Sequence, residues 1–163
     1  MMNKRRRGAH FFSALLLVVT AAAVPLSTPG AFSSIQKKFD PEGQFNPLGN
    51  PPKGLEEVAS IDLFRSGRNR PFTSHTHSGV VTTRGVVYRF QTISVSQNNF
   101  TFTTRARGGV SYRFAGRFLK GGVYAEMDST LWDQPLLEGT LTKFKNGKKV
   151  AESRMRFSYF GGT

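Results

Sequence analysis

Residues 55–163 alternate apolar and polar side chains with a period of two, and this pattern constrains the fold more than any other feature. Tyr112 and Phe114 share one parity, whereas Arg113 between them has the other. Successive residues of a strand point to opposite faces of a sheet. The pattern therefore predicts antiparallel strands with one apolar face and one basic or hydroxylated face.

Turn signals separate these runs. The dipeptide Asn146-Gly147 is the strongest, because both residues tolerate the positive φ angles of a type I′ hairpin. The predicted strands span residues 57–65, 72–83, 86–96, 100–106, 110–118, 123–130, 136–145 and 148–160. Eight strands with short turns predict an all-β protein, a single antiparallel meander that forms a small closed or nearly closed barrel without exposed edges.

The first 54 residues differ in composition from the rest. Residues 1–23 combine a basic start, an apolar stretch and small residues near position 23, which is the pattern of a secretory signal peptide. An uncleaved anchor is the alternative. Residues 24–54 hold six of the eight prolines and predict an extended or disordered leader without regular structure. The barrel domain is then 55–163, and we expect export to a bacterial periplasm or the extracellular space.

Charge and composition exclude several chemistries. The formal net charge is +13, and without residues 1–23 the chain keeps 19 basic and 10 acidic residues, a net of +9. The absence of cysteine excludes disulfides, thiolate metal sites and cysteine nucleophiles. His75 and His77 share a strand face, but no third metal ligand lies nearby in the sequence. The sequence therefore predicts no catalytic residue, no metal and no cofactor.

One predicted strand changes parity in its middle. Tyr88 and Phe90 share one parity, whereas Ile93 and Val95 have the other. A bulge near Gln91–Thr92 absorbs one residue and restores a single apolar face.

The hairpin at Asn146-Gly147 fixes a register with an unexpected consequence. A two-residue turn pairs Glu138 with Met155 and so places this carboxylate on the apolar face. One interpretation is that the Glu138 carboxylate is a polar group in a ligand cavity, where it binds and orients the ligand. Alternatively, Glu138 lies at the rim of the barrel, or a bulge turns it outward.

The inward face is aromatic, and it suggests the first functional hypothesis. An eight-stranded barrel is either filled by side chains or holds one small ligand. We expect an exported, non-enzymatic barrel that binds a small apolar or amphipathic molecule. The predicted ligand-binding residues are Tyr88, Phe90, Phe102, Tyr112, Phe114, Glu138, Phe157 and Tyr159. An isomerase or cyclase that uses Glu138 in the same pocket is a third alternative.

The outward face is basic, and it suggests the second hypothesis. This is an envelope-associated structural or adhesion module that binds anionic surfaces such as phospholipid or lipopolysaccharide headgroups. Nucleic acid is disfavoured, because base stacking requires aromatic residues on the same face as the arginines. Arginines in mid-strand also disfavour an integral membrane barrel. The predicted anion-binding residues are Arg113, Arg117, Arg154 and Arg156.

An export signal followed by an eight-stranded meander is similar in layout to lipocalin-type barrels. The Gly-x-Trp expected near the first strand of that family is missing, since the lone tryptophan is Trp132. The resemblance therefore implies a fold and carries no function.

Overall fold

A computed structural model describes residues 39–65 and 77–161, and within them it contains eight strands and two short 3-10 helices. The strands are β1 (Gly43–Pro47), β2 (Val58–Arg65), β3 (His77–Thr83), β4 (Val86–Ser96), β5 (Asn99–Thr104), β6 (Val110–Phe118), β7 (Leu137–Lys145) and β8 (Lys148–Phe160). The 3-10 helices are η1 (Tyr124–Glu126) and η2 (Ser129–Leu131).

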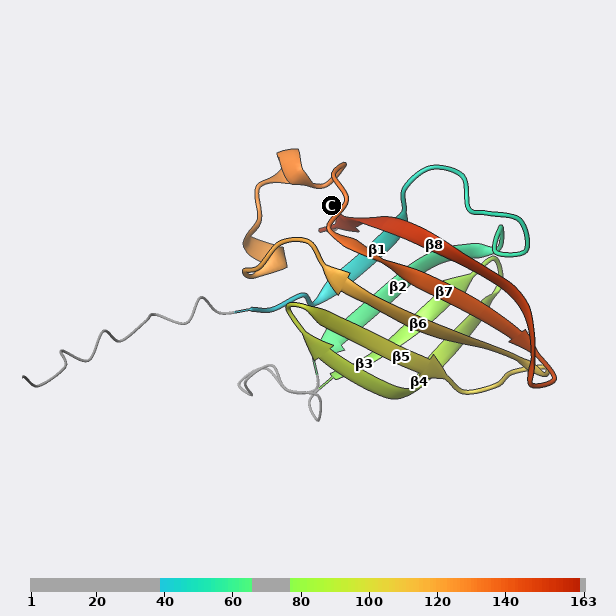
Figure 1. The fold of residues 1–163 in the computed structure, drawn as a ribbon. Helices are drawn as coiled ribbons and strands as arrows, with labels where there is room; N and C mark the ends of the chain where they lie inside the picture. Colours follow the sequence, from blue (N-terminus) through green and yellow to red (C-terminus); the bar gives the residue numbers. More distant parts are fainter. Residues whose placement is uncertain (1–38, 66–76, 162–163) are drawn as a thin grey trace, which may run out of the picture. The chain divides into compact units, whose positions relative to one another are not determined.

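The eight strands form a closed barrel (Figure 1). Each strand pairs antiparallel with the next, and β1 also pairs with β8, which confirms the predicted meander and its closure. The connections β1–β2, β3–β4, β5–β6 and β7–β8 lie at one end, which we call the hairpin end. Residues 39–42 and the connections β4–β5 and β6–β7 lie at the other, which we call the capped end.

The eighth strand is not where the sequence predicted it. Residues 123–130 form η1 and η2 instead of a strand, because they cross the capped end and bury Tyr124 there. The missing strand is β1, inside the segment predicted to be an unstructured leader. Its Phe45 is fully buried and pairs with Tyr159, and its proline is the last residue of the strand, where a missing N–H is tolerated. Residues 1–38, with the predicted signal peptide, lie outside the described residues.

Two predicted details of register are confirmed. The β4–β5 register shifts between Phe90 and Thr92, as expected for the bulge. Asn146 and Gly147 have φ angles of 50° and 76°, and Lys145 pairs with Lys148 across them. A second bulge was not predicted: the β7–β8 register shifts beside Phe144, and Val150 is the extra residue.

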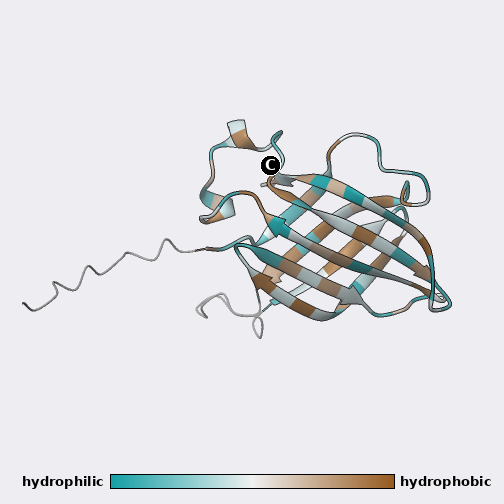
Figure 2. Cartoon of the chain, in the orientation of Figure 1, coloured by the Kyte–Doolittle hydropathy of each residue, from teal (hydrophilic) through white to brown (hydrophobic). Residues whose placement is uncertain are grey.

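Aromatic side chains fill the barrel, and three glycines make room for them. Along the strands, apolar and polar residues alternate as the sequence pattern predicted (Figure 2). A Cβ atom on Gly116 or Gly139 would lie 2.7 Å or less from the ring of Phe114, and a Cβ on Gly79 would lie 2.3 Å from the ring of Phe90. These rings therefore lie flat against the sheet, over positions that have no side chain.

Candidate functional site

All seven aromatic residues predicted to line a ligand cavity lie on the inner face. Their rings contact one another: the centroids are 4.0 Å apart for Phe90 and Phe102, 5.5 Å for Phe102 and Phe114, and 5.9 Å for Phe114 and Phe157. These are distances of packed aromatic pairs. The rings thus occupy the space that an internal ligand would need.

Glu138 does not lie inside the barrel, so the prediction of a polar group in a ligand cavity is wrong. The bulge at Val150 shifts the register by one residue, and Glu138 pairs with Arg156 instead of Met155. Its side chain therefore lies on the outer face, where Arg117 of β6 is its partner on the other side. This outcome is the alternative in which a bulge turns the carboxylate outward, and it leaves an isomerase or cyclase without its proposed residue.

Two guanidinium groups bind the Glu138 carboxylate through the same oxygen. Nη2 and Nε of Arg117 lie 2.9 and 3.0 Å from Oε1, and Nη2 of Arg154 lies 3.2 Å from it. Only 9% of the Glu138 side chain is exposed, whereas the side chains of Arg117 and Arg154 are 61% and 72% exposed. The hydrogen bond from Arg117, helped by the charge of Arg154, holds the pKa of Glu138 below its usual range. The acid therefore stays ionised and orients both arginines.

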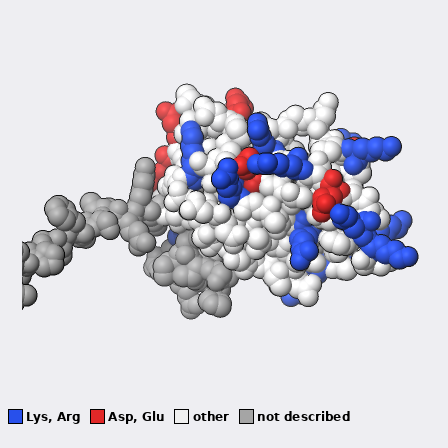
Figure 3. Space-filling view, viewed as in Figure 1, with Lys and Arg blue, Asp and Glu red and all other residues white. Residues whose placement is uncertain are grey.

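The four predicted anion-binding arginines lie in β6 and β8, in rows that cross β7 between them. Arg117, Glu138 and Arg156 form one row, and Arg154 lies beside Thr140 in the next. Arg113 lies opposite Thr142, one row further toward the hairpin end. All four arginines are exposed, and we call this surface the β6–β8 face. Figure 3 shows basic side chains around an acidic group over these strands.

The hairpin end carries a second group of basic side chains. Hydrogen bonds link its connections: Asn146 donates to the carbonyl of Gly109, and Arg84 donates to the carbonyl of Glu57. Basic side chains gather at this end in Figure 3. The exposed lysines and arginines of this end are Lys53, Arg84, Arg105, Arg107, Lys145, Lys148 and Lys149.

A hydrogen-bonded cluster inside the hairpin end was missed by sequence reasoning. The bulge that turns Glu138 outward also brings Lys143 to Glu57, with Nζ 2.6 Å from Oε1, and the Tyr112 hydroxyl donates to the same oxygen at 2.7 Å. Burial by itself raises the pKa of Glu57, but the bonds from Lys143 and Tyr112 outweigh it and keep the pKa below its usual range. Burial also raises the pKa of Tyr112. The cluster therefore holds a carboxylate, an ammonium group and a neutral phenol.

The capped end is closed by apolar packing and carries acidic side chains. The fully buried ring of Tyr124 contacts Phe118 and Phe45, and its hydroxyl donates to the carbonyl of Lys120 at 2.9 Å. Asp40 forms an ion pair with Arg65 beside it. The exposed acids of the described part of this end are Glu42, Glu126, Asp128 and Asp133.

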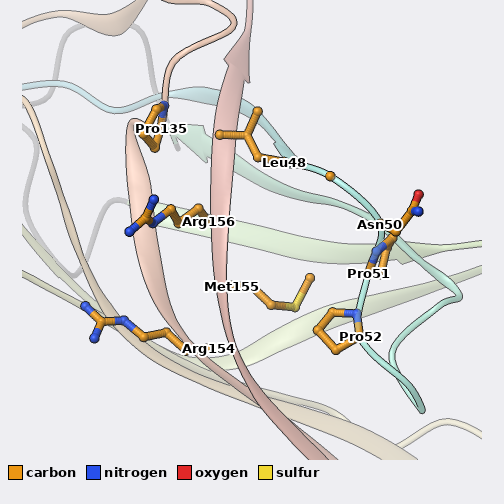
Figure 4. A pocket seen from close by; sticks show the side chains of 9 residues that line it. Leu48, Asn50, Pro51, Pro52, Pro135, Arg154, Met155 and Arg156 are labelled. Atoms are coloured by element: carbon orange, nitrogen blue, oxygen red, sulfur yellow. The ribbon is translucent and has the colours of Figure 1, made fainter.

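A hollow lies where the β1–β2 connection diverges from β8 (Figure 4). Its volume is about 680 Å³. Leu48, Met155 and the prolines 51, 52 and 135 line it, together with Arg154 and Arg156. The groove thus combines apolar walls with two cations of the β6–β8 face.

The remaining polar candidates do not form a site in the described part of the chain. His77 is buried at the start of β3, and His75 lies outside the described residues. Glu126 ends η1, whereas Asp128 is the N-cap residue of η2. Over residues 39–65 and 77–161, no group of three potential metal ligands occurs, and no helix is long and apolar enough to cross a membrane.

No protein-family model matches the chain, and neither a curated protein nor a solved structure matches it. Functional inference therefore depends on the chemistry of the barrel itself.

Proposed function

We propose that this protein is an envelope-associated structural or adhesion module that binds anionic surfaces through basic side chains outside its barrel. The observation that carries the proposal is the arrangement of the β6–β8 face, where Arg113, Arg117, Arg154 and Arg156 are exposed side by side. Glu138 neutralises part of this charge and orients two of the guanidinium groups. A guanidinium group can donate two parallel hydrogen bonds to two oxygens of a phosphate or carboxylate. Such a surface is therefore suited to anionic headgroups.

The filled interior supports this choice over an internal ligand site. The aromatic rings pack at contact distance, so the barrel serves as a rigid scaffold and its chemistry lies on the outside. The proposal also requires that the protein meets an envelope surface. The export signal predicted for residues 1–23 would bring it there.

The test is sedimentation with vesicles of phosphatidylcholine, alone and mixed with phosphatidylglycerol or lipopolysaccharide. We expect binding to the anionic vesicles only, with an affinity that falls as salt screens the charges. Arg154→Gln should weaken binding to the lipopolysaccharide vesicles severalfold, because each cation near an anionic surface contributes about 1 kcal/mol. Arg89→Gln removes an exposed cation from β4 and is the matched control. Equal binding to neutral vesicles, or no effect of salt, would contradict the proposal.

A second candidate function is the binding of one small amphipathic anion in the outer groove. The apolar walls at Leu48 and Pro135 suit an alkyl chain, and Arg154 and Arg156 suit its anionic head. Titration with dodecyl phosphate, with dodecyl maltoside as the neutral control, tests this. The candidate requires saturable binding of the phosphate alone, and loss of that binding in Leu48→Asp.

A further inference from the structure

The hairpin end holds more uncompensated charge than the β6–β8 face. Within the described residues, none of Arg105, Arg107, Lys145 and Lys148 forms an ion pair. The acids of this end are engaged: Glu57 binds Lys143 and Tyr112, and the Glu56 carboxylate accepts a hydrogen bond from Gly54. Within the described residues, seven exposed cations therefore gather where four connections meet.

The described part of the capped end carries exposed acidic side chains. Glu42, Glu126, Asp128 and Asp133 are exposed there, whereas the described cations of that end, Lys120 and Arg65, bind Gln134 and Asp40. An anionic surface attracts the exposed cations of the hairpin end.

Exposed apolar side chains occur at both ends, with Phe64, Leu119 and Phe160 at the capped end, but at the hairpin end they lie among the exposed cations. Val150, the bulged residue beside the β7–β8 turn, is 53% exposed, and Val87 beside the β3–β4 turn is 44% exposed. A polysaccharide or a nucleic acid offers no apolar layer to such side chains. A bilayer offers anionic headgroups for the lysines and an acyl boundary for the valines.

We infer that the hairpin end is the membrane-docking surface of this protein, and that it places the barrel upright on an anionic lipid bilayer. The inference rests on the proposed function and adds its partner and its orientation. The exposed cations of this end contact the headgroups, Val87 and Val150 reach the interface, and the capped end points away from the membrane. The β6–β8 face then stands at the side of the barrel and faces other components of the envelope.

Three exposed alanines allow a matched test, because the chain has no cysteine of its own. Ala106 lies in the β5–β6 connection at the hairpin end, Ala115 on the β6–β8 face and Ala125 in η1 at the capped end. Each is changed singly to cysteine and labelled with a dye whose emission shifts to the blue in an apolar environment. The probe is a vesicle of phosphatidylcholine and phosphatidylglycerol, with pure phosphatidylcholine as the control.

The expected result is a blue shift at position 106 alone, and only with the anionic vesicle. A shift at position 115 without one at 106 would overturn the upright orientation, while the proposed function would stand. Sedimentation of wild-type protein separates the two failures, since absence of binding to every anionic vesicle would instead remove the proposed function. A shift at position 125 would place the capped end at the membrane and also overturn the inference.

Two charge reversals of equal size give an independent test. Lys148→Glu at the hairpin end and Lys120→Glu at the capped end change the net charge by the same amount. Lys148→Glu should weaken binding to anionic vesicles roughly 30-fold, and Lys120→Glu less than about twofold. Equal losses would show that net charge alone drives binding, and would overturn a docking end.

Discussion

The two ends of this barrel are closed by different chemistry. At the capped end, the buried ring of Tyr124 packs against four other aromatic rings, and its hydroxyl is satisfied by backbone carbonyls. At the hairpin end, closure depends on the ionised Glu57 with Lys143 and Tyr112. Apolar burial is insensitive to pH, whereas an ion pair loses its attraction when the acid is protonated. The stability of the capped end therefore depends on the burial of aromatic rings, whereas that of the hairpin end also depends on the ionisation of Glu57.

Removal of the aromatic cap gives the largest expected effect. Tyr124→Ala deletes a fully buried ring and should cost about 3–5 kcal/mol of the free energy of unfolding. Tyr124→Phe keeps the ring, loses the bonds to Lys120 and Leu136, and should cost about 1 kcal/mol. Urea unfolding of both variants checks this order. A loss below about 1 kcal/mol in Tyr124→Ala would mean that the capped end does not unfold with the barrel.

Neutralisation of Glu57 is expected to have the next largest effect. Glu57→Gln replaces the charged acceptor of Lys143 and Tyr112 and should cost about 1–3 kcal/mol at neutral pH. Because the pKa of folded Glu57 is lowered, its contribution is complete above the unfolded pKa and is lost as the pH falls through the folded pKa.

Unfolding of wild-type protein and Glu57→Gln at several pH values checks that dependence. As the pH falls below 4.5, the usual pKa of a glutamate such as Glu57, the stability of the wild type should approach that of the variant. Tyr124→Phe is the control, since it should stay below the wild type by a constant amount. A stability difference between wild type and Glu57→Gln that does not change with pH would contradict an ionised cluster at the hairpin end.

Local patterns in the sequence predict most of this fold. Alternation identifies the inner aromatic face, the change of parity identifies the bulge at Gln91, and Asn146-Gly147 identifies the last hairpin. The arginines of the β6–β8 face follow from the same alternation. The sequence misses β1, because this strand forms only where β2 and β8 supply both of its neighbours. Proline and glycine propensities are weaker than that tertiary pairing.

The candidate site was predicted less well, for a physical reason. A shift of the strand register by one residue turns every side chain of that strand to the opposite face of the sheet. The bulge at Val150 has no local signature in the sequence, yet it decides that Glu138 is outside and that Lys143 reaches Glu57. Ring packing could not be predicted either. The role of Gly116 and Gly139 depends on their position beneath the ring of Phe114, which only the structure gives.

Backbone strain distinguishes the glycines of the two ends. Gly147 has a φ of 76° with no atom near its absent Cβ, so Gly147→Ala should cost about 1 kcal/mol through its backbone alone. Gly122 at the capped end has a φ of 114°, which side chains rarely adopt, and Gly122→Ala should cost more, about 1–3 kcal/mol. Thermal unfolding of both variants checks the order, and a reversed order would show that the hairpin turn is the more constrained.

The smallest expected effects concern exposed charge. Lys148→Glu at the hairpin end and Asp133→Lys at the capped end should each change the free energy of unfolding by less than about 0.5 kcal/mol. Both should be slightly stabilising, because each relieves repulsion between like charges, and salt should remove the gain. Denaturant unfolding at low and high salt measures this. A loss of more than about 1 kcal/mol in the free energy of unfolding of either variant would show that the charge at that end stabilises the fold. Otherwise the fold does not require this charge, which agrees with its proposed role in the binding of an anionic surface.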